Sequence, residues 1–266
     1  MQDNNNNYLT NMFKIKILKM LNLQDELNKK IDKNWLTKPE HDFHWRCDAM
    51  VEIGELLAST GYKHWKLDKL DIKNVKMEVI DVFHFLISQV LYNSNNNKIH
   101  IDDVADVLSN IFRKNLIQSE LNKYDEKYEN YFINNFKFNP DKNLGDEKYF
   151  RNKLIDLCEE FIIKNRKGKD AFASSNALVK IIALTFETFD EFYNLYLVKN
   201  ALNIVRQKKG YKEGTYIKLW DKTREDNEIA IEYINENPQL TELDMDVLVE
   251  KLIDLYERYE NELSQK

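Results

Sequence analysis

WRCDAMVEIGEL at residues 45–56 and KMEVIDVFHF at residues 76–85 are the two segments that decide the fold of this chain. Each segment carries two acidic residues three positions apart, namely Glu52 with Glu55 and Glu78 with Asp81. A three-residue step places both carboxylates of a pair on one face of an α-helix. The separation of the two pairs suits one helix, a turn and a returning helix. We therefore predict a helical hairpin on which four carboxylates converge.

Four carboxylates held close together repel one another by several kcal/mol at an effective dielectric constant of about 20. Apolar residues such as Ile53, Leu56 and Val82 flank the pairs, and buried acids are costly without a compensating charge. A single pair of this kind is common on a solvated helix, but two pairs on neighbouring helices are not. A hard divalent cation would hold them together, and ligands that are all oxygen favour Mg²⁺ or Mn²⁺ over zinc. The pattern therefore predicts a metal site and metal-bound phosphate chemistry.

The composition favours long helices, because the 266 residues include only 6 Gly and 3 Pro and 32% of them are charged. No strand pattern persists, so we predict an all-α fold. Apolar periodicity predicts helices at 13–30, 43–58, 71–92, 174–189, 190–209 and 243–262. Residues 98–165 also have helical patterns and could form an insert or cap. We expect a single domain over residues 1–266 that contains this insert.

Charge and cysteine content narrow the class of protein. The net charge of −6 argues against a broad surface for duplex nucleic acid, so we expect no nucleic-acid partner. Cys47 and Cys158 are the only cysteines, which favours a reducing compartment over a disulfide framework. The sequence has no apolar run of membrane-spanning length, and its first residues lack the basic start and apolar centre of a signal peptide. We expect a cytoplasmic protein without a membrane partner.

A basic helix face follows in LVKNALNIVRQ at residues 197–207. Lys199, Asn203 and Arg206 lie on one stripe of that helix, and no acidic residue occurs between Leu195 and Lys212. An arginine fork and a lysine point charge suit an oligophosphate. The alternative is an ordinary polar face with acidic partners. GYKEGTYIK at 210–218 could close over a ligand with its two glycines as hinges, or it could be a surface loop.

Polar and aromatic residues elsewhere could surround a planar base, although each also has an ordinary interpretation. Gln24 and Asn28 are one helical turn apart and could read the polar edge of a base, or they could simply be solvated. Trp65 is more often a core aromatic than a stacking platform. His84 and Phe85 could be a hydrogen-bonded core histidine and a packed phenylalanine.

Taken together, these segments resemble the dimeric all-α dUTPases, which are relatives of the MazG-type nucleoside triphosphate pyrophosphohydrolases. The ExxE and ExxD pairs are shared by that whole superfamily. Their combination with KNxLNxxRQxxGYxxGxYxK at residues 199–218 is specific to the dUTPase branch. LQDELN at 23–28 and KHWK at 63–66 also match, so that the resemblance spans about residues 13–92 and 174–227.

The resemblance implies hydrolysis of dUTP, and of dUDP as well, to dUMP by a homodimer that closes over its substrate, which limits uracil incorporation into DNA. It implies that Mg²⁺ is held by Glu52, Glu55, Glu78 and Asp81, with Mn²⁺ as a substitute, and that one glutamate activates the attacking water, Glu55 in preference to Glu52. Asn203 would contact phosphate or a metal. The other implied contacts are Lys199, Arg206, Tyr211 and Lys218 on phosphate, Gln24, Asn28, Trp65 and His84 around uracil, and Phe85 against the deoxyribose.

Two other functions stay open at this stage. One is a related pyrophosphohydrolase for another deoxynucleotide such as dCTP, and the other is a helical protein-interaction module that lacks the chemistry. The joint presence of four acids and a basic face favours an enzyme. The chain departs from the expected pattern at one point, where Lys222-Thr223-Arg224 stands in place of a glycine before Glu225.

Overall fold

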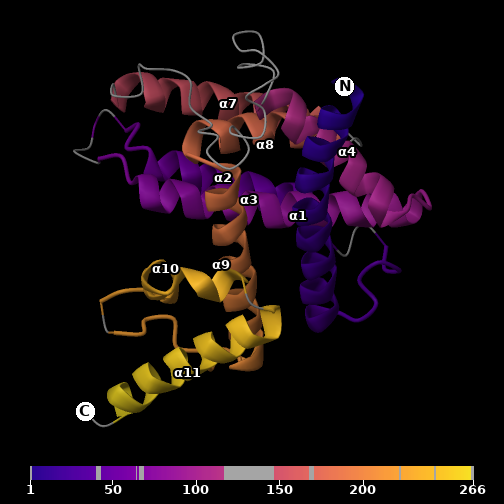
Figure 1. The fold of residues 1–266 in the computed structure, drawn as a ribbon. Coiled ribbons are helices and arrows are strands. Elements are labelled where there is room, and N and C mark those ends of the chain that lie inside the picture. The colour runs from indigo at the N-terminus through magenta and orange to yellow at the C-terminus, as the bar shows by residue number, and fades with distance from the viewer. Residues whose placement is uncertain are drawn as a thin grey trace. The chain divides into compact units, whose positions relative to one another are not determined.

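The computed structural model describes residues 2–39, 43–63, 65, 69–116, 147–167, 171–221, 223–242 and 244–264. These residues form α-helices joined by turns (Figure 1). Across the described ranges, extended pairing is limited to one isolated antiparallel bridge between Leu219 and Glu225. The predicted all-α fold is confirmed. The helices are α1 (Gln2–Ile31), α2 (Trp45–Ser59), α3 (Ile72–Asn96), α4 (Ile101–Leu116), α7 (Glu147–Lys167), α8 (Ala171–Thr185), α9 (Phe189–Lys208), α10 (Asp226–Glu236), the 3₁₀-helix η4 (Pro238–Glu242) and α11 (Met245–Ser264).

Each helix predicted outside residues 98–165 is present, and among the described residues the 3₁₀-helix η4 and one α-helix were not predicted. That helix is α10, whose start is fixed by a capping box in which the Glu225 side chain bonds the backbone of Glu228 and the Glu228 side chain bonds back. Of the predicted insert at 98–165, the structure describes α4 and α7, whereas residues 117–146 lie outside the described ranges. The single domain with an insert stays a prediction.

The chain divides into two compact units, of which the first contains residues 1–25 and 34–192. Helix α3 is central to this unit, because it contacts α2, α4 and α8, and α7 in turn packs on α8 and α2 (Figure 1). Val75, Val79 and Val82 on α3 are fully buried. The hairpin that carries the two acidic pairs, α2 with α3, therefore includes the central helix of this unit.

An aromatic cluster fills the core of this first unit. The ring of Phe192 meets those of Phe83 and Phe186 edge-to-face at centroid distances of 5.0 Å and 5.4 Å. Phe189 makes similar contacts with Phe13 at 4.8 Å and Phe112 at 5.3 Å. Edge-to-face rings of this kind add about 0.5–1.5 kcal/mol per pair beyond the burial of their surface.

The second unit contains residues 26–33 and 193–266. Its core is also aromatic, because Tyr256 of α11 stacks on Tyr216 at 5.1 Å and meets Trp220 at 5.8 Å. Helix α9 ends where the sequence predicts, since Gly210 has a φ of 86° and follows the last turn. A Cβ at Gly210 would lie 2.0 Å from Thr215 Oγ1, so the turn requires glycine.

In the ranges that the structure describes, none of the helices combines the length and the apolar character needed to cross a membrane.

Candidate active site

The turn that joins α2 to α3 is held by hydrogen bonds between the two helix ends. The Asp71 side chain caps α3 by accepting from the Asn74 backbone N–H at 3.0 Å. The Asn74 side chain donates to Ser59 Oγ at 2.7 Å, and the Asp71 N–H donates to the Ser59 carbonyl at 2.9 Å. Because Ser59 is the last residue of α2, these bonds fix the two helices of the hairpin against each other.

Carboxylates from both helices meet on this hairpin. One oxygen each from Glu52, Glu55 and Glu78 lies within 4.8 Å of the others. Glu78 is buried, Glu52 is half-buried and Glu55 is exposed, so the group extends from the protein interior to its surface. The structure thus brings together three of the four predicted carboxylate ligands within reach of one ion.

The environment of this group raises the pKa of Glu52 from 4.5 to about 8. Burial is the largest cause, followed by repulsion from Asp81, Glu55 and Glu78. Asp81, the fourth predicted ligand, is therefore close enough to Glu52 to act on it. At an effective dielectric constant of about 20, two charges 4.8 Å apart repel by about 3.5 kcal/mol.

The donor set fits a hard divalent cation. Carboxylate oxygens are the ligands that Mg²⁺ and Mn²⁺ prefer, and a cation would relieve the repulsion that raises the pKa of Glu52. The group can therefore bind a metal. Asn203, which the sequence also suggests as a metal or phosphate contact, belongs to the second unit.

A buried polar chain lies near the carboxylates, one turn further along α3. Gln24 of α1 and His84 of α3 meet through Oε1 and Nδ1 at 2.5 Å, and Gln24 Nε2 donates to Ser88 Oγ at 3.0 Å. Both Gln24 and His84 are buried. The structure thus joins two of the residues predicted around a base. Ser88 was missed by the sequence analysis, and its position one turn after His84 is the signal that could have found it.

The other residues predicted around a base differ in their exposure. Phe85 is half-buried, with its ring 6.4 Å from that of Trp45. Trp65 is 64% exposed and meets Tyr62 edge-to-face. Asn28 is buried and belongs to the second unit. Their roles toward a base stay predictions.

In the second unit, the basic face of α9 has an acidic partner that the sequence analysis missed. Arg206 donates from Nε and Nη2 to the two carboxylate oxygens of Asp226, at 2.7 Å and 2.8 Å. Asp226 is fully buried and also accepts from the Tyr216 hydroxyl at 2.8 Å. Burial by itself would raise the pKa of Asp226, but the hydrogen bonds and charge of Arg206 outweigh it and lower that pKa.

The remaining residues of the basic face join the same network. Arg206 Nη1 donates to Asn203 Oδ1 at 3.2 Å, and Arg206 Nη2 donates to Asn227 Oδ1 at 3.1 Å. Lys199 Nζ also donates to Asn227 Oδ1, at 3.2 Å. The structure therefore brings Lys199, Asn203 and Arg206 together, as the helical spacing predicts. The sequence analysis looked for acidic partners only within and next to this helix. Asp226 and Asn227 lie at the start of α10 and were therefore missed.

The loop between α9 and α10 places the last two predicted phosphate contacts. Tyr211 is half exposed, its N–H donates to the Arg206 carbonyl at 2.9 Å, and its ring centroid lies 5.8 Å from the Arg206 guanidinium carbon. Lys218 is exposed and pairs with Glu225 at 2.8 Å. Where a glycine was expected, Asp221 holds the turn by accepting from the Arg224 N–H at 2.8 Å and Nε at 2.6 Å.

A comparison with protein-family models agrees with the resemblance seen in the sequence. A family model described as dUTPase matches residues 16–211, which is most of the chain. The chain belongs to the all-α dUTPase family. Membership supports a dUTP-hydrolysing function in general. The matched segment includes both carboxylate pairs and the whole basic face at residues 197–207. A search of curated proteins found no match.

Proposed function

We propose that this dUTPase-family chain hydrolyses dUTP, and also dUDP, to dUMP in a reaction that requires Mg²⁺. With dUTP the second product is pyrophosphate. The observation that carries the proposal is the convergence of Glu52, Glu55 and Glu78 oxygens within 4.8 Å, inside the segment that matches the dUTPase family. A base-selective pyrophosphohydrolase needs such a site, whereas a protein-interaction module does not.

The carboxylates have different roles because they differ in exposure. Glu52, Glu78 and Asp81 are buried or half-buried and would hold the ion, together with one oxygen of Glu55. A bound ion would neutralise charge on the phosphates and lower the pKa of a water molecule. Glu55 is exposed, so its other oxygen can accept the proton of a water from solvent. The oxygen of that water bonds to phosphorus, and the phosphoanhydride bond breaks to release dUMP and pyrophosphate.

Recognition of the substrate is assigned to the polar and basic residues. We propose that Gln24, Asn28, Trp65 and His84 surround the uracil and that Phe85 contacts the sugar. Lys199, Arg206, Tyr211 and Lys218 would bind phosphate oxygens, and Asn203 phosphate or a metal. The hydrogen bond between Gln24 and His84 supports the first assignment, since it pre-positions two polar groups in a buried setting.

The direct test is pyrophosphate release from dUTP, dCTP and dTTP, with Mg²⁺ and with excess chelator. We expect release from dUTP alone, and only with the metal. Glu55→Gln should lower kcat by several orders of magnitude and leave the helical content unchanged. Glu250→Gln, the same chemical change at an exposed position on α11, is the matched control and should have no effect. Turnover of dCTP at a rate comparable to that of dUTP would contradict the proposed selectivity for uracil. Near-normal activity of the Glu55 variant would contradict the role assigned to Glu55.

We further propose a homodimer in the cytoplasm. The dimer follows from the family resemblance, and the two free cysteines suit a reducing compartment. Sedimentation equilibrium of the purified chain tests the first point. A monomer that retains full activity would contradict it.

A further inference from the structure

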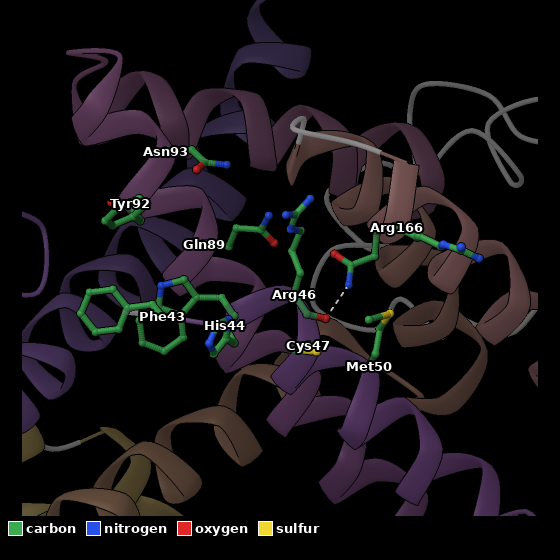
Figure 2. A pocket seen from close by; sticks show the side chains of 11 residues that line it. Phe43, His44, Arg46, Cys47, Met50, Gln89, Tyr92, Asn93 and Arg166 are labelled. Atoms are coloured by element: carbon green, nitrogen blue, oxygen red, sulfur yellow. Dashed lines mark hydrogen bonds between the residues drawn. The ribbon is translucent and has the colours of Figure 1, made fainter. Parts of the chain in front are cut away.

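A cavity lies on the same helical hairpin, further along α3 than the carboxylates. It has a volume of about 630 Å³, and α2, α3 and the end of α7 contribute its walls. Figure 2 shows Arg46 from α2 and Gln89 from α3 pointing into this space. Gln89 is eight residues after Asp81, which is about 12 Å along a helix. The volume is within the usual range of pockets for small ligands.

Three buried polar atoms of this cavity lack a hydrogen-bond partner among the residues that the structure describes. They are the amide oxygens of Gln89 and Asn165 and the indole nitrogen of Trp45. Gln89 is 6% exposed and Asn165 is 1% exposed. Asn165 donates from Nδ2 to the Arg46 carbonyl at 2.8 Å. This bond fixes the orientation of the amide and leaves its oxygen without a hydrogen bond. An unsatisfied buried acceptor costs about 1–3 kcal/mol, so a cavity that gathers two acceptors and a donor is suited to a complementary ligand.

The other walls add an aromatic surface and positive charge. Phe43 and Trp45 are stacked at 5.1 Å with an interplanar angle of 11°, and Tyr92 lies 6.2 Å from Phe43. Arg46 and Arg166 line the cavity, and none of the described residues lining it is acidic. Aromatic faces accept a planar ring, and guanidinium groups recognise phosphate.

We propose that this cavity binds a nucleoside phosphate whose base carries an amino group. Solvent does not reach these three atoms in the free chain, so the proposal includes a rotation of their side chains when the ligand enters. The two amide oxygens then accept N–H bonds from the amino edge, the Trp45 indole donates to a ring nitrogen or carbonyl, and Arg46 faces the phosphate. Adenine and cytosine carry such an amino group, whereas uracil does not. The site therefore selects against the base that the carboxylate site is proposed to take. This inference does not depend on the proposed function.

Cys47 provides the assay because it is exposed at the edge of the cavity, whereas the only other cysteine, Cys158, is buried. The rate at which iodoacetamide alkylates Cys47 in the full chain can be followed by mass spectrometry, with excess chelator present. AMP and CMP should slow the reaction saturably at millimolar concentrations. UMP should need about tenfold more, the usual worth of one hydrogen bond. Inorganic phosphate and adenosine, tested singly, separate the contributions of charge and base.

Protection of Cys47 in variants shows where the nucleotide binds. Gln89→Leu and Arg46→Ala should each raise the AMP concentration for half-protection about tenfold or more, whereas Glu55→Gln should leave it unchanged. Unchanged far-UV circular dichroism spectra and unchanged midpoints of urea unfolding show that the two cavity variants fold. No protection by any nucleotide, or equal protection by AMP and UMP, would overturn the proposal. So would loss of protection in the Glu55 variant alone. Protection that depends only on protein concentration would mean that a second copy of the chain covers the cavity.

Discussion

Replacing Asp226 by asparagine should destabilise the chain by about 3 kcal/mol, because the substitution leaves the Arg206 guanidinium without its counter-charge. Breaking a buried ion pair costs about 3–5 kcal/mol. The lower end applies, because the Arg206 side chain is still 11% exposed and asparagine keeps one accepting oxygen. The new amide NH₂ would face donors from Arg206 or from Tyr216, which adds to the destabilisation.

The assay is urea unfolding followed by far-UV circular dichroism, with the midpoint and slope compared between variants. Asp254→Asn is the matched control, since Asp254 is 66% exposed on its side chain and lies 3.9 Å from Lys251. It should change the free energy of unfolding by less than about 0.5 kcal/mol. If Asp226→Asn behaves like this control, the buried ion pair does not stabilise the second unit, and the reasoning is wrong.

The same pair makes a pH prediction. Arg206 lowers the pKa of Asp226 in the folded chain below its ordinary value of 3.8. A lowered acid pKa stabilises the folded state above the unfolded-state pKa, and this contribution is lost as the pH falls through the folded-state pKa. The stability difference between the natural chain and Asp226→Asn should therefore stay constant from neutral pH to about pH 5 and shrink below about pH 4.

Three further changes test other parts of the structure. Gly54→Ala should raise the free energy of unfolding by about 0.5–1 kcal/mol, since a Cβ there meets open space within helix α2; a lower midpoint in urea would show that space to be occupied. Gly210→Ala should lower it by about 1–3 kcal/mol, because of the positive φ and the clash with Thr215, and unchanged unfolding would contradict the turn geometry. Mg²⁺ should raise the melting temperature of the natural chain and raise it much less in Glu78→Gln, measured by calorimetry in the absence of nucleotide; an equal rise in both would place the ion elsewhere.

The fold could largely be predicted from the sequence because its signals are local. Scarcity of glycine and proline, together with apolar residues at helical spacing, located the helices at 71–92 and 243–262 to within a few residues of α3 and α11. Helix α10 was not predicted because its short apolar pattern is weak and its start depends on the Glu225–Glu228 capping box. The division into two compact units depends on long-range packing, which periodicity does not record.

The candidate site could be predicted only where its residues share a helix or a hairpin. The three-residue spacing brought Glu52 and Glu55 together, and the turn between α2 and α3 added Glu78. The cavity around Gln89 and Asn165 could not be found in this way, because 76 positions separate these residues along the chain and neither belongs to a motif. Its signal is a set of buried polar atoms without partners, which only a three-dimensional structure shows.

The acidic group and the basic face each place like charges close together, so each requires a counter-charge. The source of that counter-charge differs between the two. Among the described residues, the charged groups that raise the pKa of Glu52 are the carboxylates Asp81, Glu55 and Glu78, so an added cation would balance them. The charge of Arg206 is balanced within the chain by Asp226. Substituting Arg206 would therefore disturb stability and any phosphate contact together. Tyr211 and Lys218 are exposed and lie outside that buried pair, so substituting them tests the proposed phosphate contacts with less interference from folding.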